Sequence, residues 1–469
     1  MEGSLRQMKM ETAEALTAIR STLSRRRVVH RLVAAAAGAT GTALAVACGR
    51  AGGGPAGEGM PAPAKGTVTI RFATWASGAQ AEMKERQLEA FNQAQSGIKA
   101  VLESTSTSGE YWTKMQTQFA ASPEDVPEVF WQSGSYFLQF SASGWHLDLG
   151  PYVKRDKFDL TKHNRQLEVE EYQGKLYALP YGTGGVVMYY NKSLFDAAGV
   201  RYPTETWTWD DVRAAAQKLT RPGAAETGGQ WGFVAYPNAG ETGYLPFVYA
   251  NGGAQLNKER TRVLLDQPQT IAAFEWLTDN IYKHRIMPRP GELRRAPGQN
   301  DDFMTGKVAM FIGGTWRLSD YMPMQDFQWD MAHVPLSPTT RKRGTTFNEN
   351  PVSIPRFTRV PEAAWALAKF LNEEKAQKIM GESKRKAPTL KTAVSDPNGF
   401  LKPPPANIRV AADLYAYAQA LPFVACPAAM NEAINPELNA IYNGTKPPAE
   451  ALRAATQAGN AVLAANKCS

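Results

Sequence analysis

Several aromatic residues lie where their rings could form a binding surface, in or beside loops that are rich in glycine or follow runs of β-forming residues. These residues are Trp75, Trp131, Tyr181, Trp231 and Trp316. An aromatic ring offers a flat apolar face to a ligand. Short polar side chains nearby could bond to the polar edge of the same ligand, and the candidates are Ser133, Asn238, Asn348 and Glu349. This combination predicts noncovalent binding of a ligand with both apolar and polar surfaces.

The sequence does not show the patterns of the common catalytic or metal sites. Its five histidines have no metal-ligand spacing, and neither H-E-x-x-H, G-x-S-x-G nor a phosphate-binding loop occurs. The histidines are His30, His146, His163, His284 and His333. We therefore expect no metal and no cofactor. The 44 Asp and Glu residues leave one enzymatic alternative open, a secreted glycosidase that uses two carboxylates.

The first elements that would position these residues form a strand–helix–helix–strand series. Residues 68–72 alternate between apolar and polar side chains, and two stretches of apolar residues at helical spacing follow within 83–119. Residues 127–131 then form a short apolar run. This order predicts a parallel α/β sheet, in which ligands bind at the carboxyl ends of the strands. Trp75 and Trp131 lie at two such ends.

The next segment contains the turn residues expected of a crossover. Residues 177–185 include a proline and several glycines, so that the backbone angles can change between two lobes. A capping box at 208–211 predicts a helix that ends near Leu219. Residues 307–312 predict another buried strand, and Pro361 begins a helix that runs to about residue 371.

Composition indicates an ordered protein of more than one domain. The chain has 469 residues, of which 43% are hydrophobic and 20% charged, with 11 Trp and only 3 Cys. Chains of this length usually form two domains, and three cysteines are too few for a disulfide framework. The net charge is +8, and about half of that excess lies in the first 47 residues. Because the remaining basic residues are scattered, we do not expect a nucleic-acid partner.

The N-terminal segment has the features of an export and anchoring signal. Three arginines at 25–27 precede an apolar run over 32–46 that is rich in Ala and Gly and too short for a permanent membrane span. Ser24 with the arginines resembles a twin-arginine export signal, and the residues before Cys48 resemble a bacterial lipobox. The expected parts are a cleaved signal over 1–47, a lipidated Cys48 and a flexible Gly/Pro/Ala tether that completes 48–65.

Four segments along the remaining chain, in this order, resemble motifs of one protein family. The segments are 174–180 with 189–192, 207–211, 303–310 with 314–316, and 361–365 with 369–371. The family comprises extracellular solute-binding proteins of sugar-importing ABC transporters, the group that includes maltose-binding protein. The resemblance extends from about residue 66 to residue 390, and the order of the motifs makes it specific.

The resemblance implies an α/β, periplasmic-binding-protein-like fold. It has two discontinuous lobes, joined by hinge strands, that close on a solute. The expected lobes are 66–180 plus 337–385 and 181–336 plus 386–469. The resemblance further implies a monomer, anchored at the outer face of the cytoplasmic membrane, that delivers a sugar to the permease subunits of an ABC transporter.

The resemblance also assigns roles to the candidate residues. Trp316 matches the family's position for a tryptophan that stacks on sugar, although Thr315 stands where close relatives often carry Pro. The other aromatic candidates would form further apolar surfaces, and the four polar candidates would bond to hydroxyl groups. Trp112, Trp276 and Trp365 lie in helical patterns and are expected in the core.

Two alternatives concern the ligand. A glycerophosphate or a peptide could replace the sugar, and a phosphate would require clustered arginines or backbone amides. Arg201, Arg294 and Arg295 are candidates for such a cluster, but the sequence does not place them in the cleft.

The first testable prediction concerns the two remaining cysteines. In an exported protein, Cys426 and Cys468 could form a disulfide that closes a loop of about 40 residues and stabilises the fold by roughly 4 kcal/mol. The alternative is two unpaired thiols. Thiol titration of the denatured, unreduced soluble domain should therefore find neither thiol free, and two free thiols per soluble-domain chain would exclude the bridge.

Overall fold

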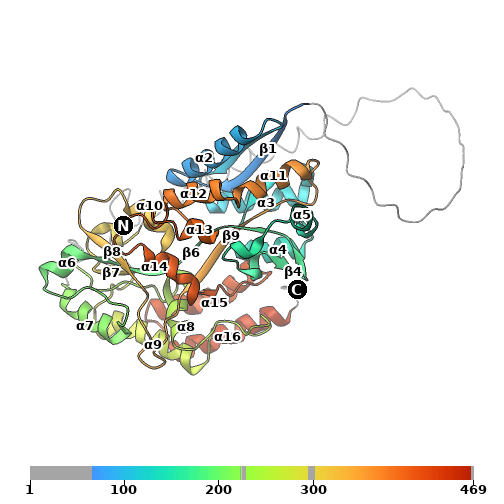
Figure 1. Ribbon diagram of the computed structural model, residues 1–469. Coiled ribbons are helices and arrows are strands. Elements are labelled where there is room, and N and C mark those ends of the chain that lie inside the picture. Colours follow the sequence, from blue (N-terminus) through green and yellow to red (C-terminus); the bar gives the residue numbers. More distant parts are fainter. Residues whose placement is uncertain (1–65, 222, 224–228, 294–300, 466–469) are drawn as a thin grey trace, which may run out of the picture. The chain divides into compact units, whose positions relative to one another are not determined.

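The chain has a mixed α/β fold built around nine connected strands (Figure 1). The computed structural model describes residues 66–221, 223, 229–293 and 301–465. The connected strands are β1 Val68–Trp75, β2 Ile98–Thr105, β3 Val129–Trp131, β6 Leu179–Asn191, β7 Met310–Gly314, β8 Trp329–Ala332, β9 Thr346–Ser353, β10 Ala387–Pro388 and β11 Gln419–Ala420. A separate two-stranded sheet pairs β4 Glu171–Tyr172 with β5 Lys175–Leu176.

Helices surround these strands. Their bounds are α2 Ala79–Ala94, α3 Ser108–Ala121, α4 Gly134–Ala142, α5 Gly150–Asp156, α6 Lys192–Ala197, α7 Trp209–Leu219, α8 Leu245–Ala250, α9 Pro268–Tyr282, α10 Leu318–Tyr321, α11 Pro361–Leu371, α12 Glu374–Ser383, α13 Lys391–Val394, α14 Arg409–Asp413, α15 Pro427–Tyr442 and α16 Pro448–Ala464.

Alternation along β1 explains why helices cover both faces of its sheet. Ile70 and Phe72 pack with residues of α2 and α11, whereas Ala73 packs on the opposite side with Tyr111 of α3. Strand β1 is parallel to β2 along its whole length and parallel to β3. The predicted parallel arrangement is therefore confirmed for β1, β2 and β3, whereas the sheet as a whole is mixed, because β3 pairs with β9, and β9 with β6, in antiparallel fashion. The series of elements was incomplete, because strand β2, residues 98–105, lies between the two predicted helices.

Strand β6 joins two sets of strands. Its 13 residues are all buried. Up to Gly185 it pairs with β9, and from Val186 it pairs with β7 and β8. We call β1, β2, β3, β9, β10, β11 and residues 179–185 the β1 sheet, and β7, β8 and residues 186–191 the β7 sheet. The sequence placed a change of lobe near residue 180, and the change of pairing partner occurs a few residues later, within one continuous strand.

The β7 sheet has apolar clusters on both of its faces. Val186 and Met188 point to a cluster that includes residues of α7, α9, α15 and α16, and Val187 and Tyr189 point to a second cluster. The predicted capping box is present at the start of α7, where Thr208 Oγ1 accepts a hydrogen bond from Asp211 N and the Asp211 carboxylate accepts one from Thr208 N. Helix α11 begins at Pro361, as expected.

Three tryptophans predicted to be core residues are buried. They are Trp112, Trp276 and Trp365. The indole Nε1 of Trp365 donates a hydrogen bond to the Asp156 carboxylate, at 2.8 Å, which satisfies its polar atom. The indoles of Trp209 and Trp276 pack together, with ring centroids 5.3 Å apart.

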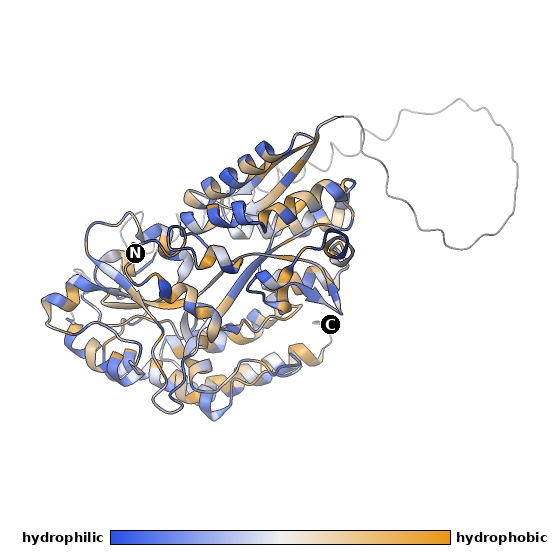
Figure 2. Ribbon diagram, in the orientation of Figure 1, coloured by the Kyte–Doolittle hydropathy of each residue, from blue (hydrophilic) through white to orange (hydrophobic). Residues whose placement is uncertain are grey.

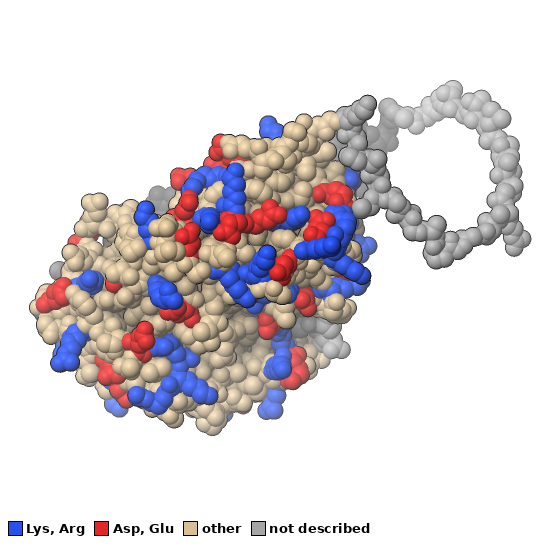
Figure 3. All heavy atoms as spheres, in the orientation of Figure 1, with Lys and Arg blue, Asp and Glu red and all other residues tan. Residues whose placement is uncertain are grey.

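The surface combines hydrophilic with hydrophobic residues and basic with acidic side chains. The surface helices in Figure 2 carry both hydrophilic and hydrophobic residues along their length. On the face shown in Figure 3, basic and acidic side chains are interspersed. Within the described ranges, no helix has both the length and the apolar run needed to cross a membrane.

Several predicted features fall outside the described residues. They include the export signal, Cys48 and the tether up to residue 65, as well as Cys468. Cys426 is half-buried at the N-terminus of α15 and takes part in a disulfide. Its pairing with Cys468 stays a prediction.

Candidate ligand-binding site

Two of the predicted aromatic residues meet at the carboxyl ends of β1 and β3. Trp75 and Trp131 stack, with ring centroids 4.0 Å apart and an angle of 27° between the planes. Trp75 also contacts the rings of Tyr111 and Trp112, at centroid distances of 5.3 and 5.2 Å. Trp131 is 2% exposed, and its Nε1 donates a hydrogen bond to the Asn350 carbonyl oxygen at 3.1 Å. Parallel pairing of β1 with β3 thus holds the two indoles side by side.

The second face of Trp131 is covered by an amine. Lys84 Nζ lies 4.1 Å from the centroid of the Trp131 ring. Because Trp75 stacks on one face at a similar distance, the amine must lie over the other. Trp131 was predicted to be an open surface for ligand stacking, whereas the structure covers both of its faces, so that a ligand could contact it only after one covering group moves.

Trp316 is held beside the same cluster by two glycines. It lies in the 3-10 turn Thr315–Arg317 that follows β7, and it is partly exposed. A Cβ on Gly184 of β6 would be 3.0 Å from the Trp316 ring, and one on Gly314 would be 2.2 Å from it. The glycines therefore allow the ring to lie across the backbone of β6 and β7.

Lys386 connects Trp131 with Trp316. Its Nζ lies 5.8 Å from the centroid of the Trp131 ring and 5.4 Å from that of Trp316. The same amine donates a hydrogen bond to Asn350 Oδ1 on β9. Arg385, the preceding residue, donates from Nη1 to the Trp316 carbonyl oxygen at 2.7 Å. Residues from the β1 sheet and from the end of β7 therefore converge at the Lys386 amine.

Glu241 adds a carboxylate that the sequence analysis missed. It lies in a π-helical turn, Gly240–Tyr244, beside the Asn348 amide and near Lys386. Burial raises the pKa of Glu241. Burial also lowers the pKa of Lys386, to about 8, although the nearby Glu241 charge opposes this decrease. Glu241 Oε1 and Asn348 Oδ1 are buried without a hydrogen-bond partner among the described residues. Turns of the π-helical type often occur at functional sites. In the sequence, the glycines that follow Asn238 were the signal that could have indicated this turn.

A cleft of about 890 Å³ extends from Glu241. One side is lined by residues of α3 and α4, including Gln116 and Tyr136, and the other by the π-helical turn and residues 421–438. Asn238, a predicted residue, lines this cleft and donates to Asn439 Oδ1 at 2.8 Å. Ser133 is the N-cap residue of α4, and its hydroxyl oxygen lies 3.1 Å from that of Ser135, which lines the cleft. The volume suits a ligand of several rings.

Three predicted residues are buried rather than open to a ligand. Tyr181 is 1% exposed and donates its hydroxyl hydrogen to Gln87 Oε1. Trp231 is 3% exposed and belongs to the apolar cluster of Val187 and Tyr189, so the structure does not bring it to Trp316. Glu349 is fully buried on β9. Their loops and strand ends resembled those of Trp75 and Trp316 in sequence, which does not reveal the direction of each side chain.

Glu349 instead forms a pair of buried carboxyl groups with Glu170. Glu349 Oε2 accepts a hydrogen bond from Gln166 N at 2.8 Å, and Glu170 Oε2 accepts one from Arg165 Nε. The two carboxyl groups lie close enough for a side-chain hydrogen bond between them, and the Oε1 atom of each is buried without a partner among the described residues. Two acceptors can share such a bond only if one carries a proton. Burial raises the pKa of both groups, and the charge of Glu170 raises that of Glu349 further, whereas Arg165 acts to lower the pKa of Glu170.

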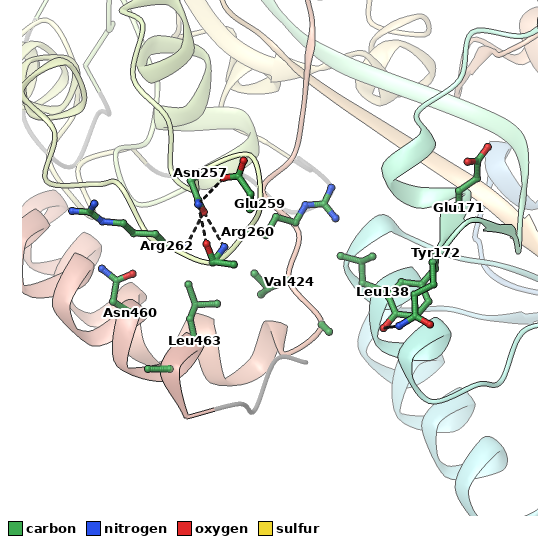
Figure 4. Close-up of a pocket in the computed structure, with 14 residues that line it drawn as sticks. Leu138, Glu171, Tyr172, Asn257, Glu259, Arg260, Arg262, Val424, Asn460 and Leu463 are labelled. Atoms are coloured by element: carbon green, nitrogen blue, oxygen red, sulfur yellow. Dashed lines mark hydrogen bonds between the residues drawn. The ribbon is translucent and has the colours of Figure 1, made fainter.

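A further pocket of about 860 Å³ lies away from the predicted residues (Figure 4). Figure 4 shows two sides of it, with Asn257, Arg262, Asn460 and Leu463 opposite Leu138, Glu171 and Tyr172. Asn257 Oδ1 accepts hydrogen bonds from Thr261 N and Arg262 N, both at 2.8 Å, and so holds its loop. Of the arginines considered for a phosphate, Arg201 is exposed, and Arg294 and Arg295 lie outside the described residues.

Residues 72–378 match the family model for bacterial extracellular solute-binding proteins. The chain belongs to this family. The resemblance found in the sequence is therefore confirmed, and the family is one of binding proteins rather than enzymes, which removes the glycosidase alternative. The expected fold is confirmed as well, because an ABC substrate-binding protein of Listeria monocytogenes, solved with cycloalternan, superimposes with a TM-score of 0.75. That match covers 85% of this chain and 99% of the other at 27% identity.

Relatives of known sequence match over shorter stretches. A binding protein of Brucella abortus is 30% identical over 42% of this chain and 47% of its own length. The arabinooligosaccharide-binding protein of Bacillus subtilis is 27% identical over 40% of this chain and 42% of its own length. The chain thus spans about half the length of the curated relatives it matches.

The carboxyl pair predicts how stability changes with pH. The raised pKa means that the pair binds its proton more tightly in the folded chain than in the unfolded chain. Above the ordinary glutamate pKa of about 4.3, the folded state therefore holds more protons than the unfolded state, and the free energy of unfolding falls as the pH rises. Glu349→Gln keeps an acceptor for Gln166 N and supplies an N–H to Glu170. Its unfolding free energy should therefore fall less than that of the wild type between about pH 5 and about pH 8, by about 1–3 kcal/mol.

Urea denaturation at the two pH values measures this difference. Glu374→Gln, an exposed change on α12, is the matched control and should follow the wild type. Parallel pH curves for wild type and Glu349→Gln would show that Glu349 carries no shared proton.

Proposed function

We propose that the chain is the membrane-anchored, extracytoplasmic receptor of an ABC sugar importer. It captures an oligosaccharide between two lobes and delivers it to the permease subunits. A glycerophosphate or a peptide is the alternative ligand.

The observation that carries this proposal is the polar and aromatic cluster around Lys386. A sugar has apolar C–H faces and a rim of hydroxyl groups that both donate and accept hydrogen bonds, so its site needs flat rings and short polar groups together. Here Trp316 and Trp131 flank an amine, and unpartnered oxygens of Glu241 and Asn348 lie beside it. Those two oxygens are acceptors that sugar hydroxyl groups can satisfy.

The names of related proteins support a carbohydrate ligand. The Bacillus subtilis relative is named for arabinooligosaccharides, and the Listeria structure holds cycloalternan. An oligosaccharide contains more than one sugar ring, and the cleft of about 890 Å³ next to Glu241 has room for more than one ring.

Closure of the two lobes on a ligand follows from the elements that carry the site residues. Trp131 and Asn348 belong to the β1 sheet, whereas Trp316 follows β7 and Glu241 lies in the π-helical turn beside it. We assign the first lobe to 66–180 plus 337–385 and the second to 181–336 plus 386–469, with β6 and β9 as hinge strands. A ligand that contacts both lobes binds the closed form better and shifts the population toward it.

Anchoring rests on the N-terminal segment. A cleaved signal over 1–47 would leave Cys48 as the first residue, and its lipid would hold the protein at the outer face of the cytoplasmic membrane. The tether up to residue 65 would let the folded body, which begins at β1, move above that surface.

A ligand screen tests the proposal. A tight ligand stabilises the folded chain by mass action, by about 2.7 kcal/mol at a concentration one hundred times its Kd. Thermal-shift measurements with mono- and oligosaccharides, glycerol 3-phosphate and short peptides should therefore give the largest rise in melting temperature with an oligosaccharide. X-ray scattering with that sugar should show a smaller radius of gyration. A rise with glycerol 3-phosphate or a peptide alone would refute the sugar proposal.

Trp316 provides a sharper prediction. Trp316→Ala removes a partly exposed ring, so affinity for the sugar selected in the screen should fall at least tenfold, which is about 1.4 kcal/mol, while the melting temperature of the empty protein changes little. Titration calorimetry measures the affinity. The control is Trp231→Phe, a buried change that should lower the melting temperature and leave the affinity unchanged. A large loss of stability in Trp316→Ala without a loss of affinity would make Trp316 a core residue.

A further inference from the structure

The Lys84 amine is buried without a polar partner. The residue is fully buried on α2, and its Nζ has no hydrogen-bond partner among the described residues. Three rings surround it instead, with centroids at 4.1 Å for Trp131, 4.8 Å for Phe72 and 4.8 Å for Tyr181. Aromatic faces attract a cation, but burying an amine without a hydrogen bond is costly. A purely structural position would be filled more favourably by an apolar side chain.

A second amine reaches the same ring. Lys386 Nζ lies 5.8 Å from the centroid of Trp131, and it interacts with Lys84 through like-charge repulsion. Lys386 is 8% exposed, so it is the outer of the two amines, and it also lies over Trp316, the ring predicted to contact ligand. Arg385 contributes a third basic group, whose Nε has no hydrogen-bond partner among the described residues.

The acidic groups nearby do not balance these cations. Glu241 acts on Lys386, and the Asp320 carboxylate lies 3.5 Å from Arg385 Nη1. The charge that acts on Lys84 is that of Lys386, which is of the same sign. Burial, with this repulsion, lowers the pKa of Lys84 well below its ordinary value. The cluster therefore has one more basic than acidic side chain, and the unmatched one is the most deeply buried.

We infer that the ligand is an acidic sugar, whose anionic group binds against Trp131 between the amines of Lys84 and Lys386. The inference rests on the proposed function and specifies its ligand class. A carboxylate, as in a uronic acid, or a phosphate, as in a sugar phosphate, supplies both the acceptor and the opposite charge that Lys84 lacks. A hydroxyl of a neutral sugar supplies only the acceptor. Entry of the anion requires the ring of Trp131 or Phe72 to move away from the amine, because Lys84 is covered in the present arrangement.

Proton uptake accompanies this binding. Burial lowers the pKa of the Lys84 amine in the empty chain, and an anion beside the amine raises that pKa, so binding of the anion is coupled to proton uptake by Lys84. Binding of a neutral sugar does not produce this uptake.

Matched pairs of ligands test the inference on the purified full-length chain. One pair is digalacturonate with galactobiose, and the other is maltose 6′-phosphate with maltose. Calorimetry should give at least tenfold tighter binding of the charged member in one pair, and the heat should depend on the ionisation enthalpy of the buffer because a proton is taken up. The pair that shows the effect distinguishes carboxylate from phosphate.

Lys84→Met assigns the effect to the buried amine. The side chain keeps its length and loses the unpartnered nitrogen, so the folded protein should be at least as stable. Affinity for the charged sugar should fall at least tenfold and the proton uptake should disappear, while neutral sugars bind as before. Lys192→Met is the matched control, because the Lys192 amine lies 5.2 Å from the Tyr202 ring, outside this cluster, and both properties should remain.

Two outcomes overturn the inference. One is that the neutral member binds equally or more tightly in both pairs, or that only neutral oligosaccharides from the screen bind. This outcome would contradict the acidic ligand but would leave the proposed function as a sugar receptor intact. The other is unchanged binding of the charged sugar by Lys84→Met. Absence of any sugar binding in these pairs and in the screen removes the proposed function together with the inference.

Discussion

The complete burial of β6 is the constraint on which the rest of the structure depends. Each backbone N–H and C=O of a buried strand needs a partner, and this strand finds partners in two sheets, changing from β9 to β7 and β8 between Gly185 and Val186. The change occurs where side chains are absent. A Cβ on Gly185 would be 2.8 Å from the Thr346 carbonyl oxygen, and one on Gly184 would be 3.0 Å from the Trp316 ring. The glycines that permit this crossing therefore also place Trp316 at its midpoint.

The same arrangement explains how charged groups can be buried here. Lys386 lies in the short connection between α12 and β10, and β10, which begins one residue later, pairs with Gly182 and Thr183 of β6. Backbone pairing thus fixes the position of an amine that an isolated loop would leave in water. Its neighbours Asn350 and Asn348 are held by β9, which pairs with the same half of β6. The pairing register of β9 and β10 with β6 determines where Asn348, Asn350 and Lys386 lie. These residues are therefore buried by the backbone pairing, even where their side chains make few favourable contacts.

The sequence predicts the elements better than the site. Alternation over 68–72, the capping box at Thr208 and Pro361 report local physics, and all three elements are present. Trp316 could be found because its turn follows a predicted strand. Glu241, Lys84 and Lys386 could not, since each lies in an ordinary local pattern and acquires its meaning from residues of other elements that the fold places beside it. Glu349 shows the converse, because a carboxylate in a suitable loop turned out to face Glu170 inside the protein.

The unpartnered atoms of the cluster connect ligand chemistry with closure. Glu241 Oε1, Asn348 Oδ1 and Lys84 Nζ lack partners among the described residues, and each buried group of this kind costs about 1–3 kcal/mol. These atoms come from the π-helical turn, from β9 and from α2. If the lobes separate, Glu241 and Asn348 move apart and water can reach both, so the empty closed form is disfavoured. A ligand that satisfies these two atoms removes the cost only while the lobes stay together, which gives it a higher affinity for the closed form. Incomplete hydrogen bonding in the empty site is therefore what makes closure depend on the ligand.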